Sequence, residues 1–447
     1  MKALLKKLIP GFVLSAYHLM LAWFAAVKFG FPANRLIVIG VTGTNGKSTT
    51  ANMIARLLEG AGHKVGLTTT ANFKIAEREW LNDQKMTMLG RTQLQSLLKE
   101  MVEAGCRYAV IETSSEGIKQ HRHAGINYDV AVFTNLTPEH IESHGSFEKY
   151  KRAKGKLFAK LSRDRRKSLN GKQIPKVIVA NALDPAAEYF LSFKADRKIG
   201  FAALKNDELV APEFFDVEVV AARKVIATGE GASFSVGGTS FSLRLPGFFN
   251  VENALAAVCA GRAVGLEDEN MAVSLMALTG VPGRTERIDE GQPFTVMVDY
   301  APEPESLKHL YQTVADLKKN RIIHVLGSCG GGRDRSRRPV LGRMAAENAE
   351  LVIVTNEDPY DDDPQEIIDQ VAAGAREAGA RDQENLFTIL DRGEAIDFAI
   401  FQAKSGDLVL VTGKGCEQAI AVAGGNKIPW DDRERLRLAI RAKLNQQ

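Results

Sequence analysis

The chain has 447 residues, of which 45% are hydrophobic and 25% are charged, and it contains 39 glycines. This composition is typical of a soluble α/β enzyme of two or three domains. The net charge of +4 is small for this length, so it permits anionic small ligands and does not favour nucleic acid as a partner. The cysteines at positions 106, 259, 329 and 416 have the spacing of neither a metal motif nor a disulfide framework, and we therefore expect a reducing, cytoplasmic location.

An apolar segment lies near the start of the chain, with no charged residue from Leu8 to Val27. Pro10 and Gly11 would break a helix at its start, and the remaining stretch is shorter than the about 20 apolar residues that a membrane-spanning helix needs. A helix that is apolar all round must be buried in lipid or in protein. We expect residues 1–31 either to lie on a membrane surface or to pack against the rest of the chain, and both alternatives stay open.

A phosphate-binding loop follows the first apolar strand, whose sequence is Leu-Ile-Val-Ile over residues 36–39. The loop residues are Gly43, Thr44, Asn45, Gly46, Lys47, Ser48 and Thr49. Glycines allow backbone N–H groups to approach phosphates, a lysine supplies positive charge, and a serine hydroxyl is a ligand for Mg²⁺. Val41 occupies a position where the standard Walker motif needs glycine, so this is a variant of that motif.

The remaining elements alternate between strands and helices. Strands are predicted at 108–112, 129–133 and 176–180 and helices at 48–60 and 92–104, with short antiparallel strands over 214–246 and a helix over 251–264. After Gly283 a second series begins, with strands at 295–299, 321–326, 350–355, 386–390 and 407–412. We predict an α/β protein with an apolar N-terminal helical segment (1–34), a central doubly wound P-loop ATPase domain (35–283) and a C-terminal Rossmann-like α/β domain (284–447).

Three polar residues near strand ends are candidates for catalysis, because open α/β sheets bind ligands there. Glu112 ends a strand and has the carboxylate that Mg²⁺ prefers, although such an acid is more often a cap or an ion pair. His140 follows the next strand and is a candidate metal ligand, although a single histidine is usually structural. Lys154 belongs to a basic run over residues 149–156, which by itself predicts a solvated helix face or an anion patch.

Together these residues resemble the Mur ligase family of ATP-dependent amide-bond ligases, in the branch of the UDP-N-acetylmuramyl-tripeptide synthetases. Residues 43–48 match the family's phosphate loop, and Tyr150, Ala153, Lys154, Leu157 and Phe158 match its Tyr-x-x-Ala-Lys-x-x-Leu-Phe motif. The motif lysine is carbamylated in many members. The resemblance implies catalytic roles for Lys47, His140 and Lys154, and two Mg²⁺ ions held by Ser48, Glu112, His140 and carbamylated Lys154.

The same resemblance extends to the end of the chain. It implies that Asn250, Asn253, Arg284 and Asp299 contact ATP beside the phosphate loop. It also implies a substrate site made of Thr87, Ser114, Arg333, Glu357, Asp358, Tyr360, Gly413 and Glu417.

Two departures from the family bear on the substrates. Tyr360 replaces the arginine that holds the distal carboxylate in diaminopimelate enzymes, and Asp361–Asp363 add acidic residues nearby. Lysine or ornithine therefore fits better than meso-diaminopimelate, unless these acids are only a solvated loop, an alternative of equal weight. Only about 34 residues precede the first strand, too few for the family's UDP-binding domain. A lipid-linked substrate is one hypothesis that follows.

The predicted function is the ATP-dependent addition of a free amino acid to a muramyl-peptide-type precursor through an acyl phosphate. The alternatives are a folylpolyglutamate or poly-γ-glutamate synthase-like ligase and a non-catalytic homologue at the membrane. We expect a cytoplasmic monomer, with residues 1–31 as the candidate contact with the inner membrane face or with an apolar substrate tail.

Overall fold

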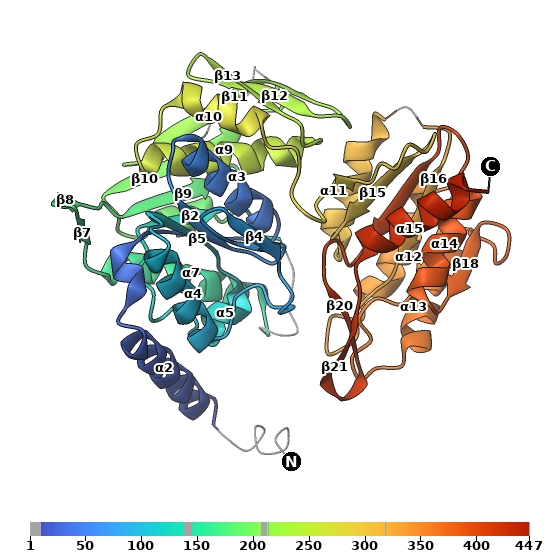
Figure 1. Ribbon diagram of the computed structural model, residues 1–447, viewed down its shortest axis with the longest axis horizontal. Coiled ribbons are helices and arrows are strands. Elements are labelled where there is room, and N and C mark those ends of the chain that lie inside the picture. The colour runs from blue at the N-terminus through green and yellow to red at the C-terminus, as the bar shows by residue number, and fades with distance from the viewer. Residues whose placement is uncertain (1–9, 138–144, 207–211, 213, 318, 447) are drawn as a thin grey trace.

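Two α/β lobes lie side by side in the computed structural model, which describes residues 10–137, 145–206, 212, 214–317 and 319–446 (Figure 1). The central lobe is built on an 11-stranded sheet and the C-terminal lobe on a six-stranded sheet. The predicted boundary near Gly283 falls between the last strand of the first sheet and the first strand of the second. That boundary stays a prediction.

The central sheet has the strand order β13-β12-β11-β10-β9-β6-β1-β5-β2-β3-β4, and all neighbours from β11 to β2 are parallel. Its strands are β1 (Ile37–Thr42), β2 (Val65–Thr68), β3 (Asn72–Ile75), β4 (Arg78–Leu81), β5 (Tyr108–Glu112), β6 (Val130–Phe133), β9 (Val177–Asn181), β10 (Arg197–Ala203), β11 (Glu218–Ala227), β12 (Ala232–Val236) and β13 (Thr239–Leu243). A small separate hairpin is formed by β7 (Ser168–Leu169) and β8 (Lys172–Gln173).

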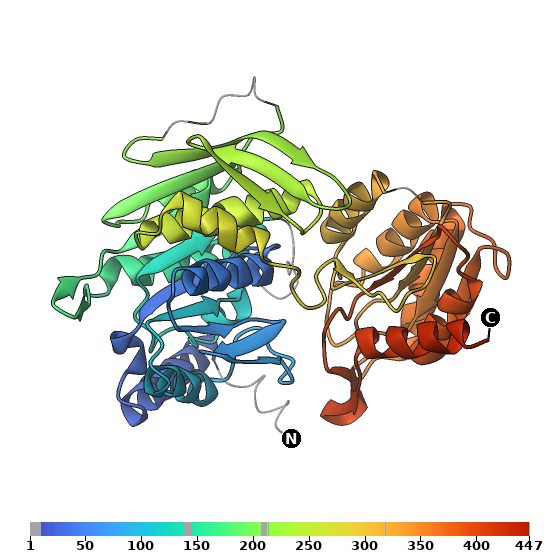
Figure 2. The same ribbon diagram turned by 45° about the horizontal axis from the view of Figure 1, so that its top comes forward.

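Helices cover both faces of the central sheet, as the expected doubly wound fold requires (Figure 2). One face packs against α3 (Lys47–Gly60), α9 (Phe248–Ala263) and α10 (Asp268–Met276), and the other against α4 (Arg91–Glu103), α5 (Ser115–Lys119), α7 (Phe147–Arg163) and α8 (Ala187–Leu191). In β1, Ile37, Ile39 and Val41 belong to the first core and Val38 to the second. This alternation explains why the strand is apolar throughout.

The prediction of antiparallel strands over residues 214–246 is correct for β12 and β13. It is wrong for one edge of β11. That strand pairs parallel with β10 on one side and antiparallel with β12 on the other. It therefore extends the parallel sheet and at the same time begins the antiparallel addition.

The C-terminal sheet has the order β14-β15-β19-β16-β17-β18 and is parallel except at β14. Its strands are β14 (Glu286–Arg287), β15 (Thr295–Asp299), β16 (Ile322–Leu326), β17 (Leu351–Thr355), β18 (Leu386–Ile389) and β19 (Leu408–Thr412). Helices α11 (Pro304–Ala315), α12 (Arg337–Asn348) and α13 (Pro364–Glu377) cover one face, and α14 (Arg392–Gln402) and α15 (Asp432–Leu444) the other. A hairpin of β20 (Ala419–Val422) and β21 (Asn426–Pro429), joined by η2 (Ala423–Gly425), extends from this lobe.

The apolar N-terminal segment forms helix α2 (Gly11–Lys28), which is followed by η1 (Pro32–Arg35). Its small residues Ala22, Ala25 and Ala26 are buried against the central lobe, where Ala26 contacts the backbone turn at Gly125. Most of its large apolar residues are instead exposed, whereas Leu14 and Leu21 are half-buried. Within the described part of the chain, no helix has the length and apolar character needed to cross a membrane.

Candidate active site

A cavity between the lobes brings together most of the residues singled out in the sequence. Its walls include Gly43, Thr44, Asn45, Gly46, Lys47, Ser48, Thr49, Thr87, Glu112, Ser114, Lys154, Asn253, Arg284, Asp299 and Arg333. The site sits at the carboxyl ends of parallel strands in both sheets, because β1, β5 and β15 end at its walls. His140 lies outside the described residues.

The phosphate loop is held at Gly46 in a shape that only glycine permits. Gly46, which precedes α3, has a φ of +79°, and a Cβ atom there would lie 2.1 Å from Asn253 Oδ1. The Asn45 N–H donates to Asn135 Oδ1 at 2.8 Å, and Lys47 Nζ donates to the Thr44 carbonyl at 2.6 Å. The loop is therefore pre-shaped, with the start of α3 directed at the cavity, which is the arrangement that binds phosphate.

Glu112 accepts three hydrogen bonds at the end of β5. Ser48 Oγ and the Thr70 N–H each donate to Oε2 at 2.7 Å, and Thr70 Oγ1 donates to Oε1 at 3.0 Å. Hydroxyl and carboxylate oxygens are the ligands that Mg²⁺ prefers, so Ser48 and Glu112 fit a magnesium site. Thr70 was not recognised in the sequence, because nothing in its neighbourhood signals a contact with residue 112.

Lys154 points into the phosphate loop although it belongs to a strongly basic stretch of α7. Its side chain is 1% exposed, and Nζ donates to the Gly43 carbonyl at 2.6 Å. Nζ also lies 4.4 Å from the centre of the Tyr150 ring, whose hydroxyl is 3.2 Å from Thr44 Oγ1. The alternative of a solvated surface charge is therefore wrong for this lysine.

The predicted nucleotide contacts come from both lobes. Arg284 stacks on the Tyr300 ring at 4.5 Å and donates to Ser48 Oγ at 3.2 Å, so it connects the C-terminal lobe to the phosphate loop. Asp299 accepts the Thr285 N–H at 2.6 Å, and burial raises the pKa of Asp299, a rise that Arg284 opposes. These contacts join the segment that follows Gly283 to the cavity wall.

The two asparagines of α9 occupy different positions relative to this cavity. Asn253 lines it, and its Nδ2 donates to Asn250 Oδ1 at 3.1 Å. Asn250 lies outside the cavity and donates to the Pro246 carbonyl at 2.7 Å, so it positions Asn253 from behind.

A second cluster of predicted substrate residues lies in the C-terminal lobe, beyond the cavity walls. The carboxylates of Asp358 and Glu417 face one ammonium group there, that of Lys414. A second ammonium, that of Lys85, reaches both acids from the central lobe. Neither lysine was recognised in the sequence, although Lys414 belongs to the Gly413–Glu417 motif.

Gly413 and Tyr360 border this acid pair. A Cβ atom at Gly413 would lie 2.4 Å from Glu357 Oε2, so the loop after β19 passes close to the buried acid. Tyr360 has a φ of +53°, and its ring centre is 5.9 Å from Lys85 Nζ. The aromatic side chain therefore lies beside the Lys85 ammonium that contacts the acid pair.

The three acids that follow Tyr360 have structural roles. Asp361 Oδ1 accepts the Gly424 N–H at 2.8 Å, Asp362 pairs with Arg338 at 3.4 Å, and Asp363 caps α13. Asp361 and Asp363 are exposed, as the alternative of a solvated loop predicts, whereas Asp362 is half-buried. The acidity of the pocket therefore comes from Asp358 and Glu417.

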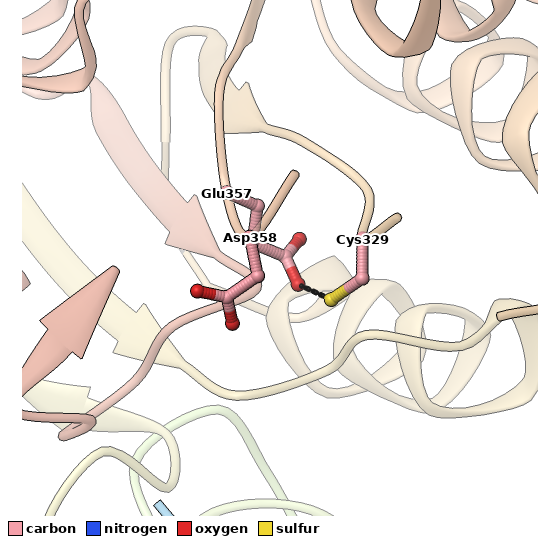
Figure 3. Close-up of side chains that lie close together, drawn as sticks. All are labelled: Cys329, Glu357 and Asp358. Atoms are coloured by element: carbon pink, nitrogen blue, oxygen red, sulfur yellow. Dashed lines mark hydrogen bonds between the residues drawn. The ribbon is translucent and has the colours of Figure 1, made fainter. Parts of the chain in front are cut away.

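Cys329, Glu357 and Asp358 form a compact buried group (Figure 3). The Cys329 thiol donates to Glu357 Oε1 at 2.7 Å, and burial together with the two acids raises its pKa. The oxygens of Asp358 already contact two lysines and the Ala421 N–H. A protonated thiol and a fully bonded carboxylate are poor metal ligands, so this group is a hydrogen-bonded support of the acid pair.

Comparisons with family models and with known proteins all identify the same family. Residues 41–261 match the model of the Mur ligase middle domain, and residues 283–415 match that of the Mur ligase glutamate ligase domain. A UDP-N-acetylmuramyl-tripeptide synthetase of Roseiflexus sp. (strain RS-1) is 40% identical over 97% of this chain and 84% of its own length. A UDP-N-acetylmuramoyl-L-alanyl-D-glutamate--2,6-diaminopimelate ligase of Geobacillus kaustophilus is 37% identical over 97% of this chain and 85% of its own length.

Solved structures share the architecture. A UDP-N-acetylmuramoyl-L-alanyl-D-glutamate--2,6-diaminopimelate ligase matches with a TM-score of 0.58 and 30% identity, covering 92% of this chain and 79% of the other. Folylpolyglutamate synthase of Mycobacterium tuberculosis, complexed with ADP and AMPPCP, matches with a TM-score of 0.66 and 20% identity, covering 88% and 92%. At that identity the second likeness concerns the fold alone.

Proposed function

The chain belongs to the Mur ligase family, and we propose that it is an ATP-dependent ligase that joins an amino acid to a carboxylate of a muramyl-peptide-type acceptor. The observation that carries this proposal is the placement of the phosphate loop on one lobe and of a buried acid pair, Asp358 and Glu417, on the other. Relatives named as muramyl-peptide synthetases and ligases support the substrate class. UDP-linked and lipid-linked forms of the acceptor are both compatible with the proposal.

The reaction has two steps in this proposal. A carboxylate oxygen of the acceptor attacks the γ-phosphorus of ATP, which gives an acyl phosphate and ADP. The amino group of the amino acid then attacks the carbonyl carbon, and inorganic phosphate leaves with the acceptor oxygen. Magnesium held by Ser48 and Glu112 would offset the charge on the transferring phosphoryl group.

The residues of the cavity orient the reactants. Lys47 and the N–H groups at the start of α3 hold the phosphates, and Arg284 brings the C-terminal lobe to the same point. Arg333 lines the cavity between the phosphate loop and the acid pocket and is the candidate partner of the amino acid's α-carboxylate. Closure of the lobes over these groups keeps water from the acyl phosphate.

Lys154 is proposed to act as a carbamate. Its amine is buried beside the phosphate loop, where an ammonium is poorly solvated. Addition of carbon dioxide to the neutral amine, with loss of a proton, gives an anion whose oxygens are suited to Mg²⁺. This modification would convert a basic residue into a metal ligand at the position that the family motif marks.

Replacing Lys154 with alanine should abolish phosphate release that depends on the amino acid, since a metal ligand is lost. Bicarbonate or a short-chain carboxylic acid should restore part of the activity by filling the space. The matched control is Lys151→Ala on the same helix, because Lys151 pairs with Glu148 at 2.8 Å on the outside. Full activity of Lys154→Ala, with melting temperatures equal to those of the unmodified chain, would refute the carbamate.

The proposed amino acid is lysine or ornithine. Tyr360 stands in place of the arginine that would hold a distal carboxylate, and Arg343 does not replace it, because Arg343 pairs with Glu377 at 2.8 Å on the surface. The carboxylates of Asp358 and Glu417 suit a distal ammonium instead.

Steady-state phosphate release with UDP-muramyl-dipeptide and lipid-linked acceptors tests both the reaction and the amino acid. A desolvated carboxylate without a cation costs several kcal/mol, and each 1.4 kcal/mol is about tenfold. We therefore expect kcat/KM for lysine or ornithine to exceed that for meso-diaminopimelate at least about a hundredfold. A preference for meso-diaminopimelate would contradict the pocket assignment. Release that depends on glutamate and a folate acceptor would favour the folylpolyglutamate alternative.

We also propose that the outer face of α2 lies on an anionic membrane surface. Phe12 is 76% exposed and Phe24 67%, and they belong to a row of large apolar residues on this helix: Phe12, Val13, Tyr17, Leu19, Met20, Trp23, Phe24 and Val27. Lys28 ends the helix, and Arg91 of α4 lies nearby, where burial and the charge of Arg122 lower the pKa of Arg91. Basic residues beside an apolar face are suited to anionic headgroups, at about 1 kcal/mol each.

The position of α2 also fits a lipid-linked acceptor. Ser114 lines the cavity and caps α5, and His121, just beyond that short helix, contacts Ser15 of α2 at 2.7 Å. The helix on the proposed membrane face is thus connected to the cavity wall by one short segment.

Substituting Met20 and Phe24 together with glutamate should remove sedimentation with phosphatidylglycerol vesicles while nucleotide affinity and melting temperature stay unchanged. Point variants suit this test better than truncation, because Ala22, Ala25 and Ala26 are part of the core. The matched control is Phe215→Glu, which removes an apolar side chain that is 99% exposed elsewhere. If the unmodified chain does not sediment with these vesicles at low salt, or if the double variant still does, the membrane proposal is wrong.

A further inference from the structure

Lys85 reaches from one lobe into the other. It lies in the loop between β4 and α4 of the central lobe, and its ammonium contacts Asp358 and, at 3.5 Å, Glu417 of the C-terminal lobe. The side chain is 6% exposed. A cation from the ATP-binding lobe is therefore buried in the pocket proposed for the amino acid.

The acid pair has a second cation that belongs to its own lobe. Lys414 Nζ lies 3.0 Å from both oxygens of Asp358 and 2.6 Å from Glu417 Oε2, and it donates to the Ala419 carbonyl at 2.7 Å. The Lys414 side chain is fully buried. These contacts use all three ammonium protons, so Lys414 is a permanent part of the pocket.

Lys85 balances one of the two negative charges of Asp358 and Glu417. Two carboxylates are matched by two ammonium groups, and without Lys85 the group would carry one uncompensated negative charge. A buried charge of this kind needs a partner. The pocket without Lys85 is therefore suited to one further ammonium group.

The backbone at Lys85 also indicates a position held by its surroundings. Its φ is +55°, in the left-handed region that residues other than glycine rarely adopt. Such conformations persist where the surrounding contacts impose them, and they are common at ligand clamps and switch segments. The preceding residue, Gln84, also contacts the C-terminal lobe, because Lys427 Nζ donates to its carbonyl at 3.3 Å.

We propose that the Lys85 ammonium occupies the place that the side-chain ammonium of the incoming amino acid takes, so that Lys85 is an internal competitor for the pocket. The inference rests on the proposed function for the chemical class of the ligand, an amino acid with a cationic side chain. Binding of that amino acid displaces Lys85, whereas an amino acid with an uncharged side chain leaves it in place. Lys85 is in this sense a specificity residue that selects for a cation able to replace it.

Displacement of Lys85 would also affect the contacts around the phosphate site. Thr87, two residues along the same loop, contacts Thr70 Oγ1 at 3.0 Å, and Thr70 donates twice to Glu112. The loop thus touches both the amino-acid pocket and the carboxylate proposed to hold magnesium.

Calorimetric titration of L-lysine into the full chain saturated with ADP tests the competition. A competitor that fills a site in about nine of ten molecules weakens the apparent affinity about tenfold. Lys85→Gln should therefore bind L-lysine at least about tenfold more tightly than the unmodified chain. Norleucine lacks the side-chain ammonium, so its affinity should be the same for Lys85→Gln and for the unmodified chain. Lys85→Arg keeps the charge and should bind L-lysine as the unmodified chain does.

The control variant is Lys427→Gln, which loosens the same loop but leaves the Lys85 ammonium in the pocket, and it should not change the affinity for L-lysine. An unchanged or weaker affinity in Lys85→Gln would overturn the proposal, as would an equal gain in Lys427→Gln. If Lys85→Gln fails to fold, Lys85→Met keeps the aliphatic stem and gives the same comparison. Because binding is measured without turnover, this result is independent of whether the ligase assay succeeds.

Discussion

The Ser48 hydroxyl joins the two lobes at the phosphate loop. It donates to Glu112 at 2.7 Å within the central lobe and accepts from Arg284 of the C-terminal lobe at 3.2 Å. The parallel pairing of β1 with β5, in which Val41 lies opposite Glu112, brings the loop after one strand beside the end of the other. The phosphate loop, the candidate magnesium ligands and the domain contact all depend on this register, and the chemistry proposed for the cavity follows from it.

The sequence predicted the parts of the fold and the site that depend on local patterns. Buried parallel strands are continuous apolar runs, and the phosphate loop has fixed spacing, so β1, β5 and Ser48 could be placed before the structure was known. The pairing of Lys85 with Asp358 could not be predicted, because these residues lie 273 positions apart. In the sequence, each charged residue alone is interpreted as a solvated surface residue. The role of Asp361–Asp363 was left open for the same reason, because their partners are backbone groups and an arginine that the sequence does not indicate.

Helix α2 shows a related limit of sequence patterns. An apolar run indicates burial but not which face is buried. Here the alanines pack on the central lobe, where close approach to Gly125 leaves no room for larger side chains, and the large residues are left outside. The packing alternative is thus correct for one face of this helix, and membrane contact through the other face stays a proposal.

The central claim is that an acceptor carboxylate is activated by ATP in the cavity before an amine attacks it. Labelling both oxygens of that carboxylate with ¹⁸O and analysing the released phosphate by mass spectrometry tests this directly. If an acyl phosphate forms, one labelled oxygen is transferred to each phosphate released, and the amide keeps the other. Phosphate without label would mean that water, and not the carboxylate, attacks ATP, and it would contradict the account.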